Sequence, residues 1–385
     1  MKQTSKFLCT YSADVFGVCS ALYELGGLVI MHDASGCNST YTTHDEPRWY
    51  TMESLVYVSA LTETEAIMGD DNKLIKDIIA VADEMSPRFI AIAGTPIPMM
   101  MGTDFTGIAH IIEKRTGIPT FGFETNGIGS YIEGAGMALE LYAKRFCTTP
   151  IEKSKNKSVN LLGVTPLDFS ITGNVEALSD FFEKNGYSVV SCWSMGSEPE
   201  QLAKAGEASV NIVASSSGLP LAKVLNKLYG TPYVVGLPIG KAAAKNLIQN
   251  AEKAIQTGEN IIPVKAEKEK ITSVKPVYII GEPVFASELA TCLTEDLKTE
   301  NVRIISPFDN ELNCGTYAES EDETFDLLKD AGTLIADPLY KRILSLNSDV
   351  KFIPFPHEAY SGRIYRSDIP MFIGEEIIPW LEKLL

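Results

Sequence analysis

Two cysteines near the amino end of the chain are the residues best placed for metal chemistry. Cys9 and Cys37 stand at the two ends of one segment, and Cys37 follows the apolar run 28–31 in a loop of Ala, Ser and Gly. Thiolates suit iron–sulfur ligation, and a cubane takes about four such ligands. Small loop residues such as Gly36 let backbone amides approach a bound cofactor. The alternative is that both cysteines are ordinary small buried residues, as free cysteines usually are.

The other five cysteines show no spacing typical of metal ligands. Cys19 lies on a helical stretch and is predicted to be a core residue. The remaining four are Cys147, Cys192, Cys292 and Cys314. An odd total of seven cysteines in a long chain differs from a disulfide scaffold and predicts a reducing, cytoplasmic location.

The elements that must position these residues alternate between strand-like and helical patterns. Apolar spacing predicts a helix at 72–85, and the run 88–93 is typical of a buried strand in a parallel sheet. Polar, charged stretches at 148–157 and 265–270 are predicted to be linkers. The alternation is typical of doubly wound, Rossmann-like α/β domains with parallel sheets. We predict three of them: 1–150 with the two cysteines, 158–264, and 271–385 with a C-terminal helix at 375–385.

Composition excludes several other classes of protein. The 385 residues carry a net charge of −17, which argues against a nucleic-acid partner because such partners require a basic surface. The chain opens without a long apolar segment, so no signal peptide is expected. The most apolar stretch, 89–101, is interrupted by Gly94, Pro96 and Pro98, and we expect no membrane span.

The segment from Cys9 to the Gly36-Cys37 pair resembles the cluster-binding region of nitrogenase component I subunits. Residues 62–70, Thr-Glu-Thr-Glu-Ala-Ile-Met-Gly-Asp, are similar to the family segment Thr-Glu-x-x-x-Val-Phe-Gly-Gly. Residues 160–174 and 230–240 are similar to the family's second domain. The resemblance implies three α/β domains packed around a central cleft. It also implies an iron–sulfur cluster, either 4Fe–4S or P-cluster-like, that Cys9 and Cys37 hold in part and that two subunits share.

The resemblance further implies an enzyme, the catalytic-component subunit of a nitrogenase-like reductase. An ATP-dependent iron–sulfur reductase would dock near residues 62–70 and deliver electrons through the interfacial cluster to a substrate in the interdomain cleft. The substrate of this family can be a tetrapyrrole, a thioether or a small unsaturated molecule, and the reaction stays unassigned. The oligomer would contain an identical or a related component I subunit. Two alternatives remain: a cofactor-assembly scaffold that holds a metallocluster precursor, and a metal-free protein that binds a small ligand.

The first departure from the family lies at its third cluster cysteine. In this chain Thr95 or Pro96 occupies the corresponding position after Gly94, and neither residue is a replacement ligand. The difference favours a simple cubane, or a subunit that contributes fewer ligands than its partner. Gly94 remains a candidate for cofactor binding. Downstream, Thr103 or Asp104 is expected to cap a helix at 104–115.

The second departure lies in the cofactor cleft. The family has a cysteine after the middle strand of its second domain, whereas this chain has Ala-Ser-Ser-Ser-Gly at 214–218. The missing thiolate argues against an iron–molybdenum cofactor. His357 stands before Tyr-Ser-Gly in a predicted loop, where a histidine is more often just a polar residue than a ligand. Ser215, His357 and Arg363 are nevertheless the catalytic candidates in this cleft.

Two further features belong to the same cleft. Arg363 and Arg366 would suit a ligand that carries carboxylates, such as a tetrapyrrole. Gly240 follows a strand and is a third candidate for cofactor binding. The stretch 236–242 is one residue short of a P-loop and has Ala where Ser or Thr would hold magnesium. Any ATP used in the reaction would therefore be hydrolysed by the separate reductase component.

Overall fold

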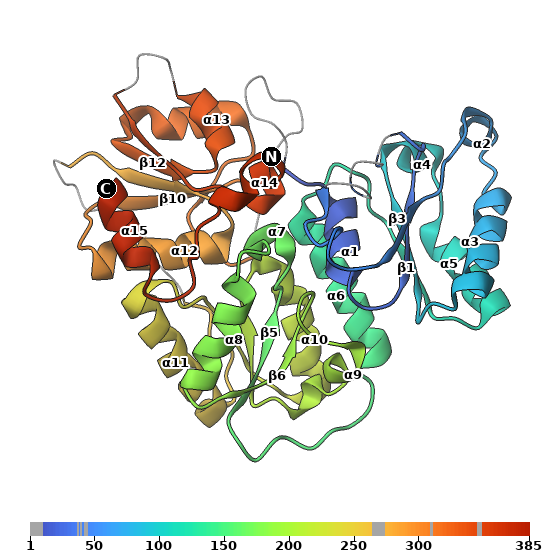
Figure 1. The fold of residues 1–385 in the computed structure, drawn as a ribbon, viewed down its shortest axis with the longest axis horizontal. Helices are drawn as coiled ribbons and strands as arrows, with labels where there is room; N and C mark the ends of the chain where they lie inside the picture. The colour runs from blue at the N-terminus through green and yellow to red at the C-terminus, as the bar shows by residue number, and fades with distance from the viewer. Residues whose placement is uncertain are drawn as a thin grey trace.

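The strands form three parallel sheets, each with helices beside it (Figure 1). The computed structural model describes residues 11–36, 38, 41, 45–263, 274–308, 311–344 and 349–385. Pairing between the strands of each sheet is parallel. Each sheet is built from strands of one of the three predicted ranges, and we refer to these parts of the fold as the first, second and third units.

The first sheet has the strand order β2-β1-β3-β4. Its strands are β1 (Leu28–His32), β2 (Leu55–Val58), β3 (Ile90–Gly94) and β4 (Thr120–Phe123). Alternate residues of the two central strands enter different cores, because side chains alternate between the two faces of a strand. Ile30 and Ile92 pack with the helices α3 (Asn72–Met85) and α5 (Phe105–Thr116), whereas Val29 and Ala91 belong to the main core on the other face. This two-sided burial is the doubly wound arrangement that the alternation predicted.

Two helices of the first unit cross at very short range. These are α1 (Asp14–Leu22) and α6 (Tyr131–Phe146). A Cβ atom on Gly17 would lie 2.0 Å from the Tyr131 carbonyl oxygen, and one on Gly134 would lie 1.8 Å from the Asp14 carbonyl oxygen. Only glycine permits this approach. The crossing fixes α1 against the helix that follows the last strand of the sheet.

The second sheet has the order β6-β5-β7-β8. Its strands are β5 (Ser158–Leu162), β6 (Ser188–Cys192), β7 (Val210–Val213) and β8 (Tyr233–Val235). Its helices are α7 (Pro166–Phe169), α8 (Asn174–Lys184), α9 (Pro199–Leu202), α10 (Leu219–Tyr229) and α11 (Gly240–Thr257). Helix α10 packs against α6, which joins the second unit to the first.

The third sheet has five strands in the order β11-β10-β9-β12-β13. They are β9 (Val277–Ile280), β10 (Val302–Ser306), β11 (Thr316–Tyr317), β12 (Thr333–Ala336) and β13 (Lys351–Pro354). The helices include α12 (Pro283–Thr291), α13 (Glu321–Leu327), α14 (Glu358–Tyr365) and α15 (Ile377–Leu384). Before α15 the chain returns to the second unit, where the Asn174 side-chain oxygen accepts the Phe372 N–H at 2.9 Å and Gly374 pairs with Ile239.

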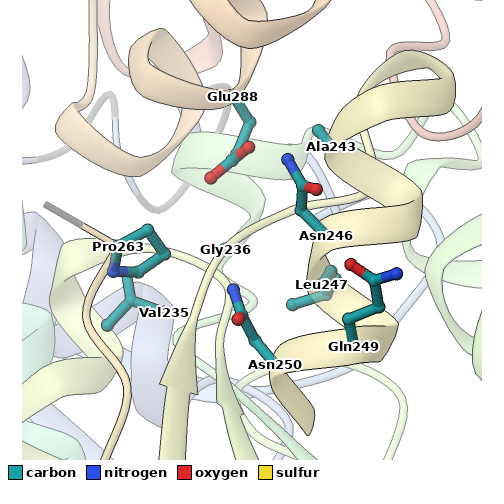
Figure 2. A pocket seen from close by; sticks show the side chains of 9 residues that line it. All are labelled: Val235, Gly236, Ala243, Asn246, Leu247, Gln249, Asn250, Pro263 and Glu288. Atoms are coloured by element: carbon teal, nitrogen blue, oxygen red, sulfur yellow. The ribbon is translucent and has the colours of Figure 1, made fainter. Parts of the chain in front are cut away.

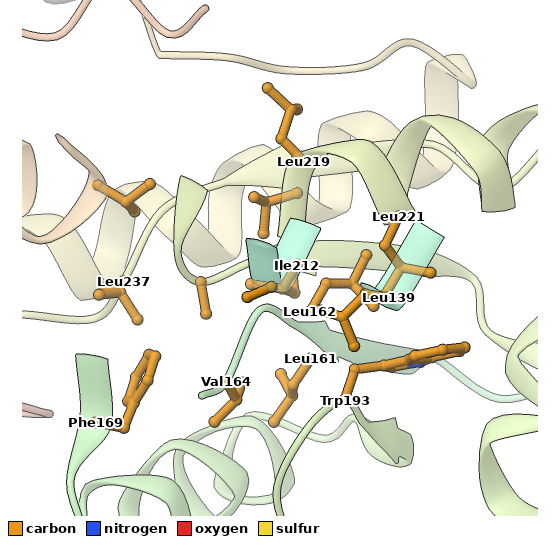
Figure 3. Close-up of a cluster of buried hydrophobic side chains, with 14 of the residues drawn as sticks. Leu139, Leu161, Leu162, Val164, Phe169, Trp193, Ile212, Leu219, Leu221 and Leu237 are labelled. Atoms are coloured by element: carbon orange, nitrogen blue, oxygen red, sulfur yellow. The ribbon is translucent and has the colours of Figure 1, made fainter. Parts of the chain in front are cut away.

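One cluster of buried side chains extends through all three units. It includes Val18 of α1, Leu161 of β5 and Ile279 of β9. Figure 3 shows its centre in the second unit, where the fully buried Trp193 and Leu161 lie close together. The three sheets therefore share an interior, although each has its own strands.

The sequence-based expectations for the fold are largely confirmed. Three Rossmann-like parallel-sheet units are present, and the predicted helix at 72–85 is α3. The C-terminal helix begins at Ile377, two residues later than expected. The predicted loop at His357 is wrong in part, because α14 begins directly after that residue. The domain boundaries stay predictions, and the linker at 265–270 lies outside the described residues.

The apolar stretch that begins at Phe89 contains two elements. The strand β3 ends at Gly94, and the short helix α4 (Pro96–Met101) follows it. Within the described part of the chain, no helix has the length and hydropathy needed to cross a membrane.

Candidate functional site

A cleft of about 600 Å³ lies between the first unit and α14. Asp33, Thr95 and Gly127, which line one side, follow β1, β3 and β4. The carboxyl ends of parallel strands therefore face this space, which is where open α/β sheets usually bind ligands. Ala359 and Arg363 of α14 line the opposite side.

The residues beside both predicted cluster ligands line this cleft. Cys9 and Cys37 themselves lie outside the described residues. Tyr11 is two positions from Cys9, and Asn38 is adjacent to Cys37, and both contribute to the wall of the cleft. Gly36 has open space around it, since a Cβ atom placed there would meet nothing within 4 Å.

The remaining cysteines are buried and lie apart from the cleft. Cys19 is fully buried in the core, as predicted. Cys147, Cys192, Cys292 and Cys314 are also buried. Among the described residues, no three His, Cys, Asp or Glu side chains are grouped so that they could hold a metal ion.

Thr95 and Pro96 are the two residues that could correspond to the family's third cluster cysteine. Thr95 is buried, and its hydroxyl donates a hydrogen bond of 2.9 Å to the His32 carbonyl. Pro96 begins α4 and lines the cleft. A Cβ atom on Gly94 would lie 2.4 Å from the Phe105 ring, so this glycine permits close packing inside the unit. Asp104 caps α5 by accepting the Gly107 N–H, which confirms that expectation.

Buried polar groups surround the end of β1. Burial lowers the pKa of His32 to about 4, so its imidazole is neutral at pH 7, and its Nδ1 atom lies 2.8 Å from the Ser59 hydroxyl. Burial also raises the pKa of Asp33, although the Ala34 N–H and Thr95 oppose the effect. The Asn38 amide donates to the Asp33 carboxylate at 2.6 Å. These contacts fix the described parts of the loop in which Cys37 stands.

A second polar site lies where the three units meet, and Asp168 is its centre. The Tyr131 hydroxyl donates to Asp168 Oδ1 at 2.6 Å, and the Ser215 hydroxyl donates to Oδ2 at 2.6 Å. His357 Nε2 lies 3.4 Å from Oδ1. Two predicted candidates, Ser215 and His357, are thus brought together through a carboxylate that the sequence analysis did not select. The available signal was its place in the short helix α7, which follows β5.

His357 also has a structural role. It is the N-cap of α14, and its Nδ1 atom accepts the Ala359 N–H at 3.3 Å. The backbone N–H of His357 and the Ser361 hydroxyl both donate to Asp337, at 2.9 and 2.6 Å. The histidine is therefore held from both sides by its own helix and the end of β12.

Glu282 lies beside this site and is fully buried. It caps α12 through the Phe285 N–H, and its other oxygen accepts from the Ser216 N–H at 2.8 Å and the Ser216 hydroxyl at 2.5 Å. Burial and the nearby charge of Asp168 raise the pKa of Glu282 to about 7. Sequence reasoning missed Glu282, whose signal was again a carboxylate after a strand, here β9.

The two predicted arginines lie away from the Asp168 site. Arg366 donates through Nε and Nη2 to Glu358 Oε1 at 2.9 and 2.7 Å, so its charge is already paired. Arg363 is on the rim of the cleft, more than half exposed, with Nη1 3.4 Å from Asp45 Oδ1. Of the two, Arg363 is the one placed to meet a ligand in the cleft.

The third glycine candidate, Gly240, begins α11. A Cβ atom there would lie 2.5 Å from the Asp296 carboxylate and 2.6 Å from the Cys292 sulfur. Asp296 accepts the N–H groups of Lys241 and Ala242, so this carboxylate takes the anion position at the helix start. Gly36, Gly94 and Gly240 therefore do not gather at one place.

A smaller cavity of about 130 Å³ lies between α11 and α12. Figure 2 shows the Glu288 carboxylate on one side of it and the amides of Asn246 and Asn250 on the other. None of the site residues predicted from the sequence lines this cavity.

The fold and the two polar sites define an α/β protein of three parallel-sheet units with strand ends facing an interunit cleft. Residues 15–311 match the family described as nitrogenase component 1 type oxidoreductase, and the chain belongs to that family. The similar proteins found for the chain agree with this assignment.

Three similar proteins illustrate the range of the family. The nitrogenase iron-molybdenum cofactor biosynthesis protein NifE of Methanosarcina barkeri is 24% identical over 257 residues, which are 60% of this chain and 54% of that protein. The nitrogenase molybdenum-iron protein alpha chain of the same organism is 23% identical over 193 residues, 49% of this chain and 36% of the other. A solved structure titled "Nitrogenase Cp1 at pH 6.5" has a TM-score of 0.71 at 16% identity and covers 100% of this chain and 94% of its own. The chain spans about half the length of the first curated relatives it matches.

Proposed function

We propose that this chain is a catalytic-component subunit of a nitrogenase-like reductase. In this proposal Cys9 and Cys37 contribute thiolates to an iron–sulfur cluster, either 4Fe–4S or P-cluster-like, that is shared with an identical or related subunit. The observation that carries the proposal is that Tyr11 and Asn38, which flank the two cysteines, line the same cleft. A cluster there would supply one-electron transfer. The setting is the cytoplasm, where thiols stay reduced.

The cleft fits a cluster that is completed by another subunit. Its described walls contain no cysteine, and Thr95 turns its hydroxyl toward a backbone carbonyl rather than into the space. Cys9 and Cys37 would therefore supply fewer ligands than a cubane needs, and a second subunit would supply the rest. The volume of about 600 Å³ also leaves room for a substrate, whose carboxylates Arg363 would meet at the rim.

An exposed apolar surface beside the cleft supports docking of an electron donor. Ile67 and Met68 of α2 (Glu63–Met68) and Met100 of α4 are each about three-quarters exposed. The two helices contact each other, so these side chains form one surface, which we call the α2–α4 surface. Exposed apolar patches of this kind mark protein interaction sites. We propose that the ATP-dependent reductase component docks there.

The decisive experiment is anaerobic iron and sulfide analysis with EPR spectroscopy of the purified protein. Cys37→Ala and Cys9→Ala are each expected to lose the iron and the cluster signal, because neighbouring residues offer no replacement thiolate. Cys19→Ala is the matched control, since Cys19 is buried in the core, and it is expected to keep full iron content. Unchanged iron in the Cys37→Ala protein would disprove the assigned role.

A second candidate is an assembly scaffold, because several similar proteins are named as cofactor biosynthesis proteins. Reductant consumption in the presence of the cognate reductase component separates the two. A reductase turns over repeatedly, whereas a scaffold takes up electrons once at most. Absence of iron from the purified protein would leave the third alternative, a metal-free ligand-binding protein.

A further inference from the structure

Two segments in which the family carries cofactor ligands are connected to each other in this chain. The family has a cysteine after the middle strand of its second domain and a histidine in its third, and the corresponding segments here contain Ser215, within 214–218, and His357. Both side chains contact Asp168, Ser215 at 2.6 Å and His357 at 3.4 Å. Each of these residues sits after a strand of the second or third sheet, so their convergence is a property of the fold.

One ring nitrogen of His357 accepts a hydrogen bond, and the other faces a carboxylate. Nδ1 accepts the Ala359 N–H at 3.3 Å, which requires a lone pair on that nitrogen. The proton of a neutral imidazole is then on Nε2, which faces Asp168 Oδ1. A metal ligand needs a free lone pair on one nitrogen. His357 has none to offer in this arrangement.

Ser215 does not replace the missing thiolate. Its hydroxyl is buried and donates to Asp168, and it also lies 3.1 Å from the Ser217 hydroxyl. A neutral hydroxyl with its proton committed to a carboxylate is a poor ligand for iron, which prefers thiolate in such clusters.

There is also little free space on the third-unit side of His357. The cavity beside His357 has a volume of about 10 Å³ and is bounded by Phe355, Tyr340 and Tyr360. A single water molecule needs about 10–15 Å³ of such space. A cofactor of several metal atoms could not enter this third-unit space unless those aromatic side chains were displaced.

We propose that Asp168 prevents an iron–molybdenum cofactor from binding at the site where the three units meet. Its carboxylate accepts hydrogen bonds from Tyr131 of the first unit and Ser215 of the second, and it lies 3.4 Å from His357 Nε2 of the third. Asp168 is a positioning residue that fixes the His357 tautomer and locks the units together. The inference does not depend on the interfacial cluster, and metal analysis distinguishes the two, since one concerns molybdenum and the other the iron held by Cys9 and Cys37.

The test measures uptake of isolated iron–molybdenum cofactor by the full chain under anaerobic conditions. After desalting, the unsubstituted protein and Ser215→Cys are both expected to contain no more molybdenum than a control protein that does not bind the cofactor. The reason is that the Asp168 carboxylate still lies against His357 in both. The double variant Asp168→Ala/Ser215→Cys is expected to gain molybdenum, since it frees His357 and adds a thiolate. Stoichiometric molybdenum in the unsubstituted protein, lost in His357→Ala, would overturn the proposal. A folded double variant that stays molybdenum-free would overturn the role given to Asp168.

A second measurement covers the case in which the double variant does not fold. Nitrogen-15 NMR of histidine-labelled protein reports which ring nitrogen carries the proton. The protein has four histidines, and the signal of His357 is the one that disappears in His357→Gln. His357 is expected in the Nε2–H tautomer, and the isosteric Asp168→Asn variant is expected to change that signal. An Nδ1–H tautomer in the unsubstituted protein would refute the assignment.

Discussion

Arg48 is the residue on which a turn of the first unit depends. Its guanidinium binds Glu46 at 2.6 Å and Glu24 at 2.9 Å, donates to the Ser20 and Ser194 carbonyls, and is 3% exposed. Burial opposes ionisation of Glu46, but the positive charge of Arg48 more than offsets this effect, so the pKa of Glu46 is lowered. A buried Arg48 or Glu46 without its partner would be an uncompensated charge and would destabilise the folded chain.

Arg48→Met is therefore expected to lower the free energy of unfolding by about 3–5 kcal/mol, because it leaves Glu46 buried without its partner. Urea denaturation followed by circular dichroism checks this. Arg88→Met is the control, since Arg88 also reaches from the first unit to the second but pairs with Glu200 on the surface. The control is expected to change little. Equal losses in both variants would show that burial of the Arg48 pair is unimportant.

Glu282 makes stability depend on pH. Its pKa of about 7 in the folded chain is above the ordinary value of a glutamate, so the folded chain keeps a proton that the unfolded chain releases. The contribution of Glu282 is fully present below the pKa of the unfolded state and is lost as pH rises to about 7. Glu282→Gln is expected to gain stability relative to the unsubstituted protein as pH rises from about 4.5 to about 7.5, measured as the difference in urea midpoints. Parallel pH profiles for Glu282→Gln and the unsubstituted protein would contradict the prediction.

At the scale of elements, the α2–α4 surface is where we propose that the reductase component docks. Met68→Lys/Met100→Lys is expected to leave the thermal midpoint almost unchanged, because both side chains are exposed, and to slow electron uptake from the cognate reductase component at least several-fold. The measurement is the rate of reductant-dependent cluster reduction. Met85→Lys is a matched control, since Met85 is also exposed but lies at the end of α3. A normal rate in the double variant would exclude docking at this surface.

The elements also show what the sequence could predict. The helix at 72–85 was found with its observed bounds because its apolar residues recur at helical spacing. Helix α4 was missed because Pro96 and Pro98 read as a break, whereas proline is tolerated in the first turn of a helix. The candidates Ser215 and His357 were identified from strand ends, but Asp168 was not. Its importance arises only when three distant segments converge, which no local pattern reveals.

At the scale of the whole molecule, the shared core predicts cooperative unfolding. The chain has three tryptophans, Trp49, Trp193 and Trp380, one in each unit. The cluster of buried side chains continues through all three units, so loss of one sheet exposes the others. We expect single-tryptophan variants, with the other two changed to Phe, to report coincident urea midpoints by fluorescence. Well-separated midpoints would show that the units unfold independently.

The α1–α6 crossing affects how variation in this protein should be interpreted. In a deep mutational scan, positions 17 and 134 should rank among the least tolerant, because even an alanine would collide with a main-chain carbonyl across the crossing. Neither glycine lines the cleft. Depleted variants at these positions would record a steric limit on how two helices approach, and they should not be counted as evidence of catalysis.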